Sequence, residues 1–411
     1  MKSIRPNILF IMTDQFRFDG LGCINRWIKT PNLDKLAKAG TLFTRAISNS
    51  LECVPARFSL ATGLYPHQSG VWENSASTLN PKHSNWMQAV ESAGYRTSVF
   101  GKTHLHQRGR DLRAALPLMH ALGMQKVHET AGPPGNQHAL SDMVELWKER
   151  GEWATYKAFM KGAAHFHPKP WPLPFELYYD VYVPQQANQF LRDLGRDKPW
   201  FCWVSFGGPH PPYDTPEPYA SMYARNRIPP PLPPINGAEN LRGLAKKAAR
   251  SPHHSPDLTT SEVAELRAYY AGAITLIDEQ IGEIVRTVTE RGELEKTLII
   301  FTSDHGEMNG DHNAFGKSTP FDGALRIPLI IVPPNAARKQ RGIRNEALVE
   351  LMDIGATIVD FAGAKLPPRS NALSLRPLLE SATRDIRQFA ISEYQQHYVM
   401  VTSQWKIEFN K

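Results

Sequence analysis

Polar side chains with known roles in catalysis and metal binding follow four apolar segments of this sequence, each at the point where the segment ends. The apolar segments are residues 7–12, 95–100, 200–206 and 298–302. In an open, mostly parallel sheet, the carboxyl ends of the strands meet at one edge, and ligands bind there. We therefore expect one site at that edge, built from the residues that follow these segments: Asp14, Gln15, Lys102, His104, His210, Asp304 and His305.

The chemistry of such a site follows from its donor atoms. Asp14 and Asp304 offer carboxylate oxygens. Gln15 and His305 add an amide oxygen and an imidazole nitrogen, and the whole set suits a divalent cation such as calcium, magnesium or manganese. A cation ringed by hydrogen-bond donors can accept a tetrahedral oxyanion, sulfate or phosphate. The donors available for this ring are Lys102, His104, His210 and Lys317.

Cys53 stands at the start of a predicted short helix, with Pro55 and Arg57 in its first turn and Gly63 at its end. The backbone N–H groups and dipole of a helix N-terminus favour an anion there. The chain has three cysteines at wide spacings, which indicate neither a disulfide framework nor a zinc site. The pattern alone leaves two readings of Cys53 open, a reactive residue or a small buried residue at a tight turn.

The elements that must position these residues alternate between strands and helices, which predicts an α/β layered fold. The four apolar segments and residues 329–332 are almost continuously apolar, as in strands covered on both faces. Residues 30–40 have the Thr, Pro and Gly signals of a capped helix. Apolar residues at helical spacing from Val263 to Val288 predict one face of a long helix.

Two segments have the composition of insertions in this scaffold, residues 105–179 and 228–257. The first is rich in histidine and tryptophan, and the second contains two proline-rich stretches. We expect them to shape the wall of the pocket, or alternatively to pack. The residues considered for the wall are His106, His165, His167 and Trp171.

The C-terminal region predicts two short strands. We expect a catalytic α/β domain over residues 1–380, and a small C-terminal β-hairpin segment over residues 381–411 that belongs to a reduced subdomain.

Charge and hydropathy limit the classes of partner. The formal net charge of +7 favours an anionic partner, but lysine and arginine are dispersed, without a recognisable nucleic-acid-binding motif. A small anionic substrate fits better than nucleic acid. The apolar run at residues 7–12 is far shorter than the roughly 20 residues of a membrane span and lacks the features of a signal peptide. The expectation is a cytoplasmic protein without a membrane segment.

The segment from Cys53 to Arg57, followed by Thr62 and Gly63, resembles the C-x-P-[SA]-R…T-G signature of type I sulfatases. Residues 30–43, 94–105, 205–223 and 303–331 are also similar to this family, so the resemblance extends from residue 7 to about residue 379. It implies an alkaline-phosphatase-like fold with a mostly parallel central sheet and helices on both faces. It also implies that a separate maturation enzyme converts Cys53 to formylglycine.

The resemblance further implies a mechanism. One hydroxyl of the hydrated formylglycine attacks sulfur and displaces the alcohol, and loss of the proton from the second hydroxyl then expels sulfate. In this family pattern, Asp14, Gln15, Asp304 and His305 bind the metal together with residue 53. Arg57 orients the hydrate, Lys102 supports hydrate and sulfate, and His104 helps to deprotonate the intermediate. His210 and Lys317 contact the sulfate and protonate the leaving oxygen.

Two departures from the usual family pattern bear on the metal and the substrate. Many arylsulfatases have Asp-Asp and Asp-Asn where this chain has Asp14-Gln15 and Asp304-His305. Calcium remains the expected metal, and the added imidazole admits manganese or magnesium as alternatives. The same pairs resemble the phosphonate and phosphodiester monoester hydrolases of the superfamily. The C-terminal region is also shorter than in most relatives.

Three hypotheses follow. The first is hydrolysis of a sulfate ester, with a sulfated small molecule or carbohydrate as substrate. The second is a phosphonate or phosphodiester monoester hydrolase with the same nucleophile, and the third is a non-catalytic anion-binding relative. The sequence does not determine the particular ester or the oligomeric state.

Overall fold

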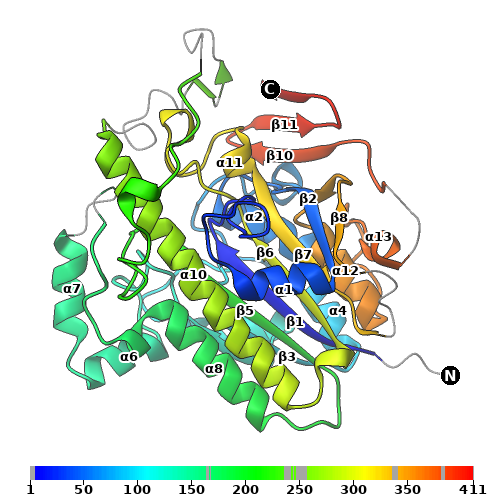
Figure 1. Cartoon of the computed structure of the whole chain (residues 1–411). Coiled ribbons are helices and arrows are strands. Elements are labelled where there is room, and N and C mark those ends of the chain that lie inside the picture. Colours follow the sequence, from blue (N-terminus) through cyan, green and yellow to red (C-terminus); the bar gives the residue numbers. More distant parts are fainter. Residues whose placement is uncertain are drawn as a thin grey trace.

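A nine-stranded sheet lies at the centre of the computed structural model, which describes residues 5–162, 166, 168–235, 242–243, 245–246, 257–335, 341–380 and 385–410 (Figure 1). The strand order is β4-β3-β5-β1-β6-β7-β2-β8, and β9 also pairs with β2. The strands are β1 Asn7–Asp14, β2 Thr41–Ile47, β3 Arg96–Gly101, β4 Lys126–Glu129, β5 Trp200–Pro209, β6 Thr297–Ser303, β7 Arg326–Val332, β8 Ile343–Asn345 and β9 Val349–Glu350.

The sheet is mostly parallel, as the sequence predicted. Strand β1 runs parallel to β5 and β6, and β3 runs parallel to β4 and β5. The exception is β7, which is antiparallel to both β6 and β2. All five predicted strands are present, and the one at residues 329–332 is this antiparallel strand. The carboxyl ends of β1, β3, β5 and β6 therefore do lie along one edge of the sheet.

Four strands of the sheet were not predicted. Strand β2 was missed because a bulge between Phe43 and Ala46 interrupts its apolar pattern. Strands β8 and β9 are only three and two residues long. Strand β4 lies inside residues 105–179, so the interpretation of that segment purely as an insertion is wrong: it supplies an edge strand of the sheet.

Helices cover both faces of the sheet because side chains of β1 alternate between two cores. Leu9 and Ile11 pack in a cluster with α1 Pro31–Ala39, α8 Tyr179–Asp193 and α10 Thr260–Glu290. Figure 1 shows these three helices on one side of the sheet. Phe10 and its neighbours in β1 pack on the other side, in a cluster with α2 Cys53–Thr62, α4 Trp86–Ser92 and α12 Asp353–Ala362.

The long helix α10 confirms the prediction from apolar spacing. It begins with a capping box, in which the Thr259 hydroxyl accepts from the Glu262 backbone N–H and the Glu262 carboxylate accepts from that of Thr259. Its buried residues include Ile274, Ile277 and Ile281. None of the helices in the described part of the chain is both long enough and apolar enough to cross a lipid bilayer.

Short helices complete the described structure. The α-helices are α3 Pro66–Ser69, α5 Leu116–Ala121, α6 Asp142–Glu149, α7 Trp153–Gly162, α11 Asp322–Leu325 and α13 Arg376–Glu380. The 3-10 helices are Leu112–Ala115, Phe175–Leu177, Arg225–Arg227, Leu294–Lys296 and Asp311–Asn313.

The residues considered for the pocket wall have mostly structural surroundings. Trp171 is buried among aromatic rings, with ring centroids 5.7 Å from Trp147 and 5.1 Å from Tyr178. The ring of His106 lies 2.9 Å from the Glu129 carboxylate at the end of β4. His165 and His167 lie outside the described residues, as does most of the second predicted insertion.

The C-terminal segment forms a three-stranded antiparallel sheet, whereas two strands were predicted. Its strands are β10 Ala390–Tyr394, β11 His397–Val401 and β12 Lys406–Asn410. The turn between β10 and β11 uses Gln395 and Gln396, both with positive φ. Two-residue hairpin turns normally need Gly or Asn there, so the sequence does not mark this turn.

The small sheet contacts the segment that leads into α2. Strand β10 forms a bridge with Ser50, and the Glu393 backbone N–H donates to Asn49 O at 2.9 Å. The Ser50 hydroxyl donates to Glu393 O at 2.8 Å. The C-terminal sheet thus helps to hold the start of the helix that carries Cys53.

Candidate active site

The structure brings together four residues from distant parts of the chain: Asp14, Cys53, Asp304 and His305. One possible ligand atom from each lies within 4.8 Å of all the others, and all four side chains are buried. Asp14 ends β1, Cys53 begins α2, and the other two directly follow β6. The strand-end positions thus converge as the sequence analysis expected.

Arg57 bridges the two aspartates of the cluster. Its Nε donates to Asp304 Oδ2 at 2.8 Å, and its Nη2 lies 3.4 Å from Asp14 Oδ2. Its Nη1 donates to the carbonyl oxygen of Lys102 and to Ser205 Oγ, the latter at 3.0 Å. The side chain is fully buried. It lies in the second turn of α2 and not in the predicted first turn, since the helix begins at Cys53.

The two aspartates have different electrostatic environments. Burial alone would raise the pKa of Asp14, but the charge of Lys102, whose Nζ lies 2.5 Å from Asp14 Oδ2, and other nearby cations hold that pKa well below its usual value. Burial and the neighbouring Asp14 charge raise the pKa of Asp304, despite Arg57. Because two buried carboxylates lie side by side, positive charge is favoured in the space between them.

Two buried atoms in this space have no hydrogen-bond partner, Asp14 Oδ1 and His305 Nε2. They lie 3.8 Å apart, and His305 Nε2 lies 3.6 Å from Asp304 Oδ1. Because His305 Nδ1 is 3.0 Å from Gly306 O, which can only accept, Nδ1 carries a proton and Nε2 is the ring atom that faces the carboxylates. Burial lowers the pKa of His305, but the Asp304 charge raises it by more, so this space favours positive charge, which either a proton on Nε2 or a divalent metal supplies. These residues therefore fit a divalent metal.

Gln15 and Lys317 lie beside this cluster. Lys317 Nζ donates to Gln15 Oε1 at 3.0 Å and lies 3.4 Å from Cys53 Sγ. Burial lowers the pKa of Lys317, but the facing Cys53 and the aspartates raise it by more, so the ammonium is charged. The backbone N–H of Gln15 donates to Asp304 Oδ1 at 3.1 Å. Gln15 has a positive φ of 69°.

His104 and His210 are both neutral imidazoles at the mouth of the site. His104 lies beside Cys53, and burial and the Lys102 charge lower its pKa to about 4. Burial and the Lys317 charge lower the pKa of His210 well below its ordinary value. His210 Nδ1 is 2.6 Å from Pro211 O, which makes Nδ1 the protonated nitrogen.

Asn74 is a neighbour of Cys53 that the sequence analysis missed. Its Nδ2 lies 3.6 Å from Cys53 Sγ, and its Oδ1 accepts from the Val54 backbone N–H at 2.9 Å. Its own backbone N–H donates to Glu52 Oε2 at 2.8 Å. Asn74 lies in a loop, outside any motif, and no pattern in the sequence connects it with the start of α2.

Buried carboxylates hold the end of β5 and the loop after it, which carries His210. Asp180 in α8 accepts from the Gly207 and Gly208 backbone N–H groups at 2.7 and 2.8 Å, and burial raises its pKa to about 8. Asp214 accepts from the Tyr179 hydroxyl at 2.6 Å. Burial raises the pKa of Asp214 to about 7, although the tyrosine hydroxyls oppose the shift.

Replacing Asp214 by Asn is expected to change how stability depends on pH. Between about pH 4 and pH 7 the unfolded chain releases this proton while the native state keeps it, so the wild-type free energy of unfolding falls as pH rises. The substitution Asp214→Asn removes that titration. We expect the free energy of unfolding of the variant, relative to that of the wild type, to rise by a few kcal/mol across this window, on the order of 1.4 kcal/mol per pH unit. Denaturant unfolding at several pH values measures this difference.

The matched control is Asp193→Asn, because Asp193 is an exposed carboxylate at the end of α8. Its difference from the wild type should not vary with pH in the same window. A constant difference for Asp214→Asn as well would contradict the raised pKa of Asp214.

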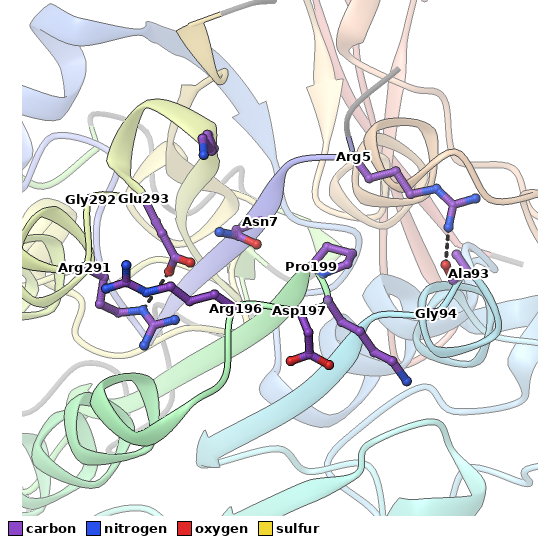
Figure 2. Close-up of a pocket in the computed structure, with 12 residues that line it drawn as sticks. Arg5, Asn7, Ala93, Gly94, Arg196, Asp197, Pro199, Arg291, Gly292 and Glu293 are labelled. Atoms are coloured by element: carbon purple, nitrogen blue, oxygen red, sulfur yellow. Dashed lines mark hydrogen bonds and ion pairs between the residues drawn. The ribbon is translucent and has the colours of Figure 1, made fainter. Parts of the chain in front are cut away.

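A groove of about 960 Å³ lies away from this site, at the edge where the strands begin (Figure 2). It is lined by Asn7 at the start of β1 and by Arg196, Arg291 and Glu293, of which the last two form an ion pair at 2.6 Å. None of the residues brought together around Cys53 lines it. The volume of a cavity therefore does not identify the active site here, and the convergence of strand ends does.

Comparison with known proteins is consistent with this geometry. The family model described as Sulfatase matches residues 6–364. An arylsulfatase of Clostridium perfringens is 29% identical, over 97% of this chain and 84% of its own length. A multifunctional alkaline phosphatase superfamily protein of Trinickia caryophylli is 30% identical, over 91% of this chain and 77% of its own length.

Solved structures show the same architecture. A phosphonate monoester hydrolase from Silicibacter pomeroyi superposes with a TM-score of 0.77 and 27% identity, covering 98% of this chain and 89% of the other. The corresponding hydrolase of Agrobacterium radiobacter has a TM-score of 0.78 and 25% identity, covering 99% and 89%. The expected alkaline-phosphatase-like fold is thus confirmed. Since the Sulfatase family model spans most of the length of this chain, the chain belongs to the sulfatase family of sulfuric ester hydrolases.

Proposed function

We propose that this protein hydrolyses a sulfate ester to an alcohol and inorganic sulfate, with a formylglycine formed from Cys53 as its nucleophile. The observation that carries the proposal is the buried cluster in which residue 53 lies within 4.8 Å of potential metal ligands from β1 and from the end of β6. A cysteine that only fills space packs among apolar side chains, whereas Cys53 faces two aspartates, an imidazole and a lysine ammonium.

The proposed metal ligands are Asp14, Gln15, Asp304 and His305, together with residue 53. When bound, the divalent metal would supply Lewis-acid charge to the nucleophile and the sulfate oxygens. The two partnerless atoms, Asp14 Oδ1 and His305 Nε2, support the fit. Calcium is the first choice, and manganese or magnesium are the alternatives that an imidazole ligand admits.

The hydrated formylglycine would supply one hydroxyl as nucleophile and a second whose deprotonation leads to release of sulfate. His104 is suited to accept that proton, because it is neutral and lies beside the side chain of residue 53. Arg57 has all three nitrogens engaged with other groups, so we assign it to holding the aspartates and, through its charge, the hydrate. Lys102 adds positive charge on the same side.

Lys317 is the better placed of the two predicted proton donors to the leaving oxygen. Its charged ammonium lies 3.4 Å from Sγ of residue 53. His210 has its proton on Nδ1, directed at Pro211 O, so its Nε2 accepts. We therefore propose that Lys317 protonates the leaving group and contacts the sulfate, and that His210 orients the ester from the loop after β5.

A second candidate function is hydrolysis of phosphonate or phosphodiester monoesters. Gln15 and His305 favour it, because one amide and one imidazole replace carboxylate and amide ligands that are common in arylsulfatases. Two structural neighbours are phosphonate monoester hydrolases. The Sulfatase family model and the arylsulfatase relative support sulfate esters as the first candidate.

Two measurements test the proposal. Mass spectrometry of the peptide that contains residue 53, after coexpression with a maturation enzyme, should show conversion to formylglycine, and full sulfatase activity with an intact thiol would refute the mechanism. Parallel kcat/KM values for an aryl sulfate, an aryl phosphodiester and a phosphonate monoester should rank the sulfate first. A non-catalytic relative would bind sulfate without turnover even after conversion.

A further inference from the structure

The side-chain amide of Gln15 is held from both ends by groups that permit only one orientation. At one end, Lys317 Nζ donates to Gln15 Oε1 at 3.0 Å. At the other, Gln15 Nε2 donates to Glu307 Oε2. An ammonium can only donate and a carboxylate can only accept, so the two contacts agree on which atom is oxygen and which is nitrogen.

Glu307 is itself firmly held. Its side chain is fully buried, and its second oxygen, Oε1, accepts from the backbone N–H groups of Asn309, at 2.9 Å, and Gly316. Both donors belong to the loop between β6 and α11, which also carries Lys317. The carboxylate therefore cannot rotate without losing two backbone hydrogen bonds, and Gln15 Nε2 must face Oε2.

We propose that Glu307 is a positioning residue that turns the oxygen of Gln15, and not its nitrogen, towards the side of the cluster where Lys317 contacts Cys53. Without Glu307, only Lys317 would hold the amide, and an amide that rotated would present Nε2, a donor with no lone pair for a cation. The inference rests on the proposed function, because it assumes that the cluster binds a divalent metal.

The substitution Glu307→Gln tests this by exchanging one oxygen for a nitrogen. The amide oxygen introduced at position 307 would keep both backbone N–H donors, so the introduced nitrogen would face Gln15 Nε2. Two facing donors repel, and a flip of Gln15 would set its Nε2 against the Lys317 ammonium, so neither orientation satisfies both ends and the oxygen is no longer held towards the cluster. Divalent-metal affinity should fall about 10- to 100-fold, as is usual when an outer partner of a ligand is lost.

The double variant Gln15→Glu with Glu307→Gln is the rescue. Here the amide nitrogen introduced at position 307 donates to one oxygen of the carboxylate introduced at position 15. The other oxygen of that carboxylate faces the cluster and Lys317. The number of carboxylates in the pair is unchanged. We expect this variant to recover metal affinity to within a few-fold of the wild type, which a merely structural role of Glu307 would not predict.

Metal affinity is read out by elemental analysis of protein dialysed against calcium or manganese at several concentrations, and by the metal-dependent rise in Tm. Asp278→Asn is the matched control, since this carboxylate is also buried and accepts from the backbone N–H groups of Asn32 and Leu33. It should lower Tm and leave metal affinity unchanged.

The outcomes separate this inference from the proposed function. If the wild type takes up no divalent metal, both are overturned. If the wild type binds metal and Glu307→Gln binds it equally well, only the role of Glu307 is overturned. If Glu307→Gln does not fold, the double variant decides, because a folded double variant that has lost metal affinity overturns the role.

Discussion

Replacing Cys53 by alanine is expected to lower kcat/KM for an aryl sulfate by at least about 10⁴-fold relative to the converted wild type. The loss is this large because the substitution removes the nucleophile, and catalytic groups that act as a unit fail together. The remaining charges of Arg57, Lys102 and Lys317 would still bind the anion. Initial rates with wild-type and variant protein, each coexpressed with the maturation enzyme and loaded with the same metal, measure the effect.

Cys23→Ala is the control for this substitution. Cys23 is half-buried, and its backbone contacts Asp34 and Arg344, neither of which belongs to the cluster. We expect activity close to that of the wild type. If Cys53→Ala kept activity comparable to Cys23→Ala, residue 53 would not be the nucleophile, and neither formylglycine nor the thiol would be needed.

Replacing Arg57 by methionine is expected to destabilise the metal-free protein by about 3–5 kcal/mol. The guanidinium lies between Asp304 and Asp14, and all three side chains are fully buried. Removing it leaves two buried carboxylates facing one another without their shared cation. Urea unfolding in the presence of a chelator measures the loss.

Arg376→Met is the matched control, because Arg376 also bridges two carboxylates, Asp360 at 3.2 Å and Glu380 at 2.8 Å. Its side chain is 36% exposed, so water screens the pairs and we expect a loss of at most about 1 kcal/mol. Bound metal should restore part of the stability of Arg57→Met, since it replaces positive charge between the aspartates. Equal losses for the two variants would show that Arg57 does not hold the cluster.

Much of the site was predictable because sheet topology turns a local pattern into a spatial one. An apolar strand followed by a polar residue can be recognised within about ten residues of sequence, and parallel strands deliver their ends to one edge. Asp14, Lys102, His104, His210 and Asp304 were all found in this way. Cys53 and Arg57 were found because the residues that mark the start and the end of a short helix are also close together in the sequence.

The residues that were missed depend on contacts between loops. Asn74 reaches Cys53 only because its backbone binds Glu52, and Glu307 reaches Gln15 only because its other oxygen is held by the loop before Lys317. Such contacts have no period and no fixed spacing. The third strand of the C-terminal sheet and strand β2 were missed for a related reason, since the residues of the Gln395–Gln396 turn and of the bulge are not typical of such features.

The sequence by itself determined which residues end the strands, which cysteine begins a helix, and therefore which chemical groups meet at one edge of the sheet. These follow from side-chain periodicity and capping, which act over a few residues. Only the tertiary structure decided how the groups face one another: that Arg57 lies between the aspartates, that Lys317 Nζ lies near both Gln15 Oε1 and Cys53 Sγ, and that Glu307 accepts from Gln15 Nε2. Those choices depend on distances of a few ångströms between segments about 300 residues apart, where burial sets the strength of every charge.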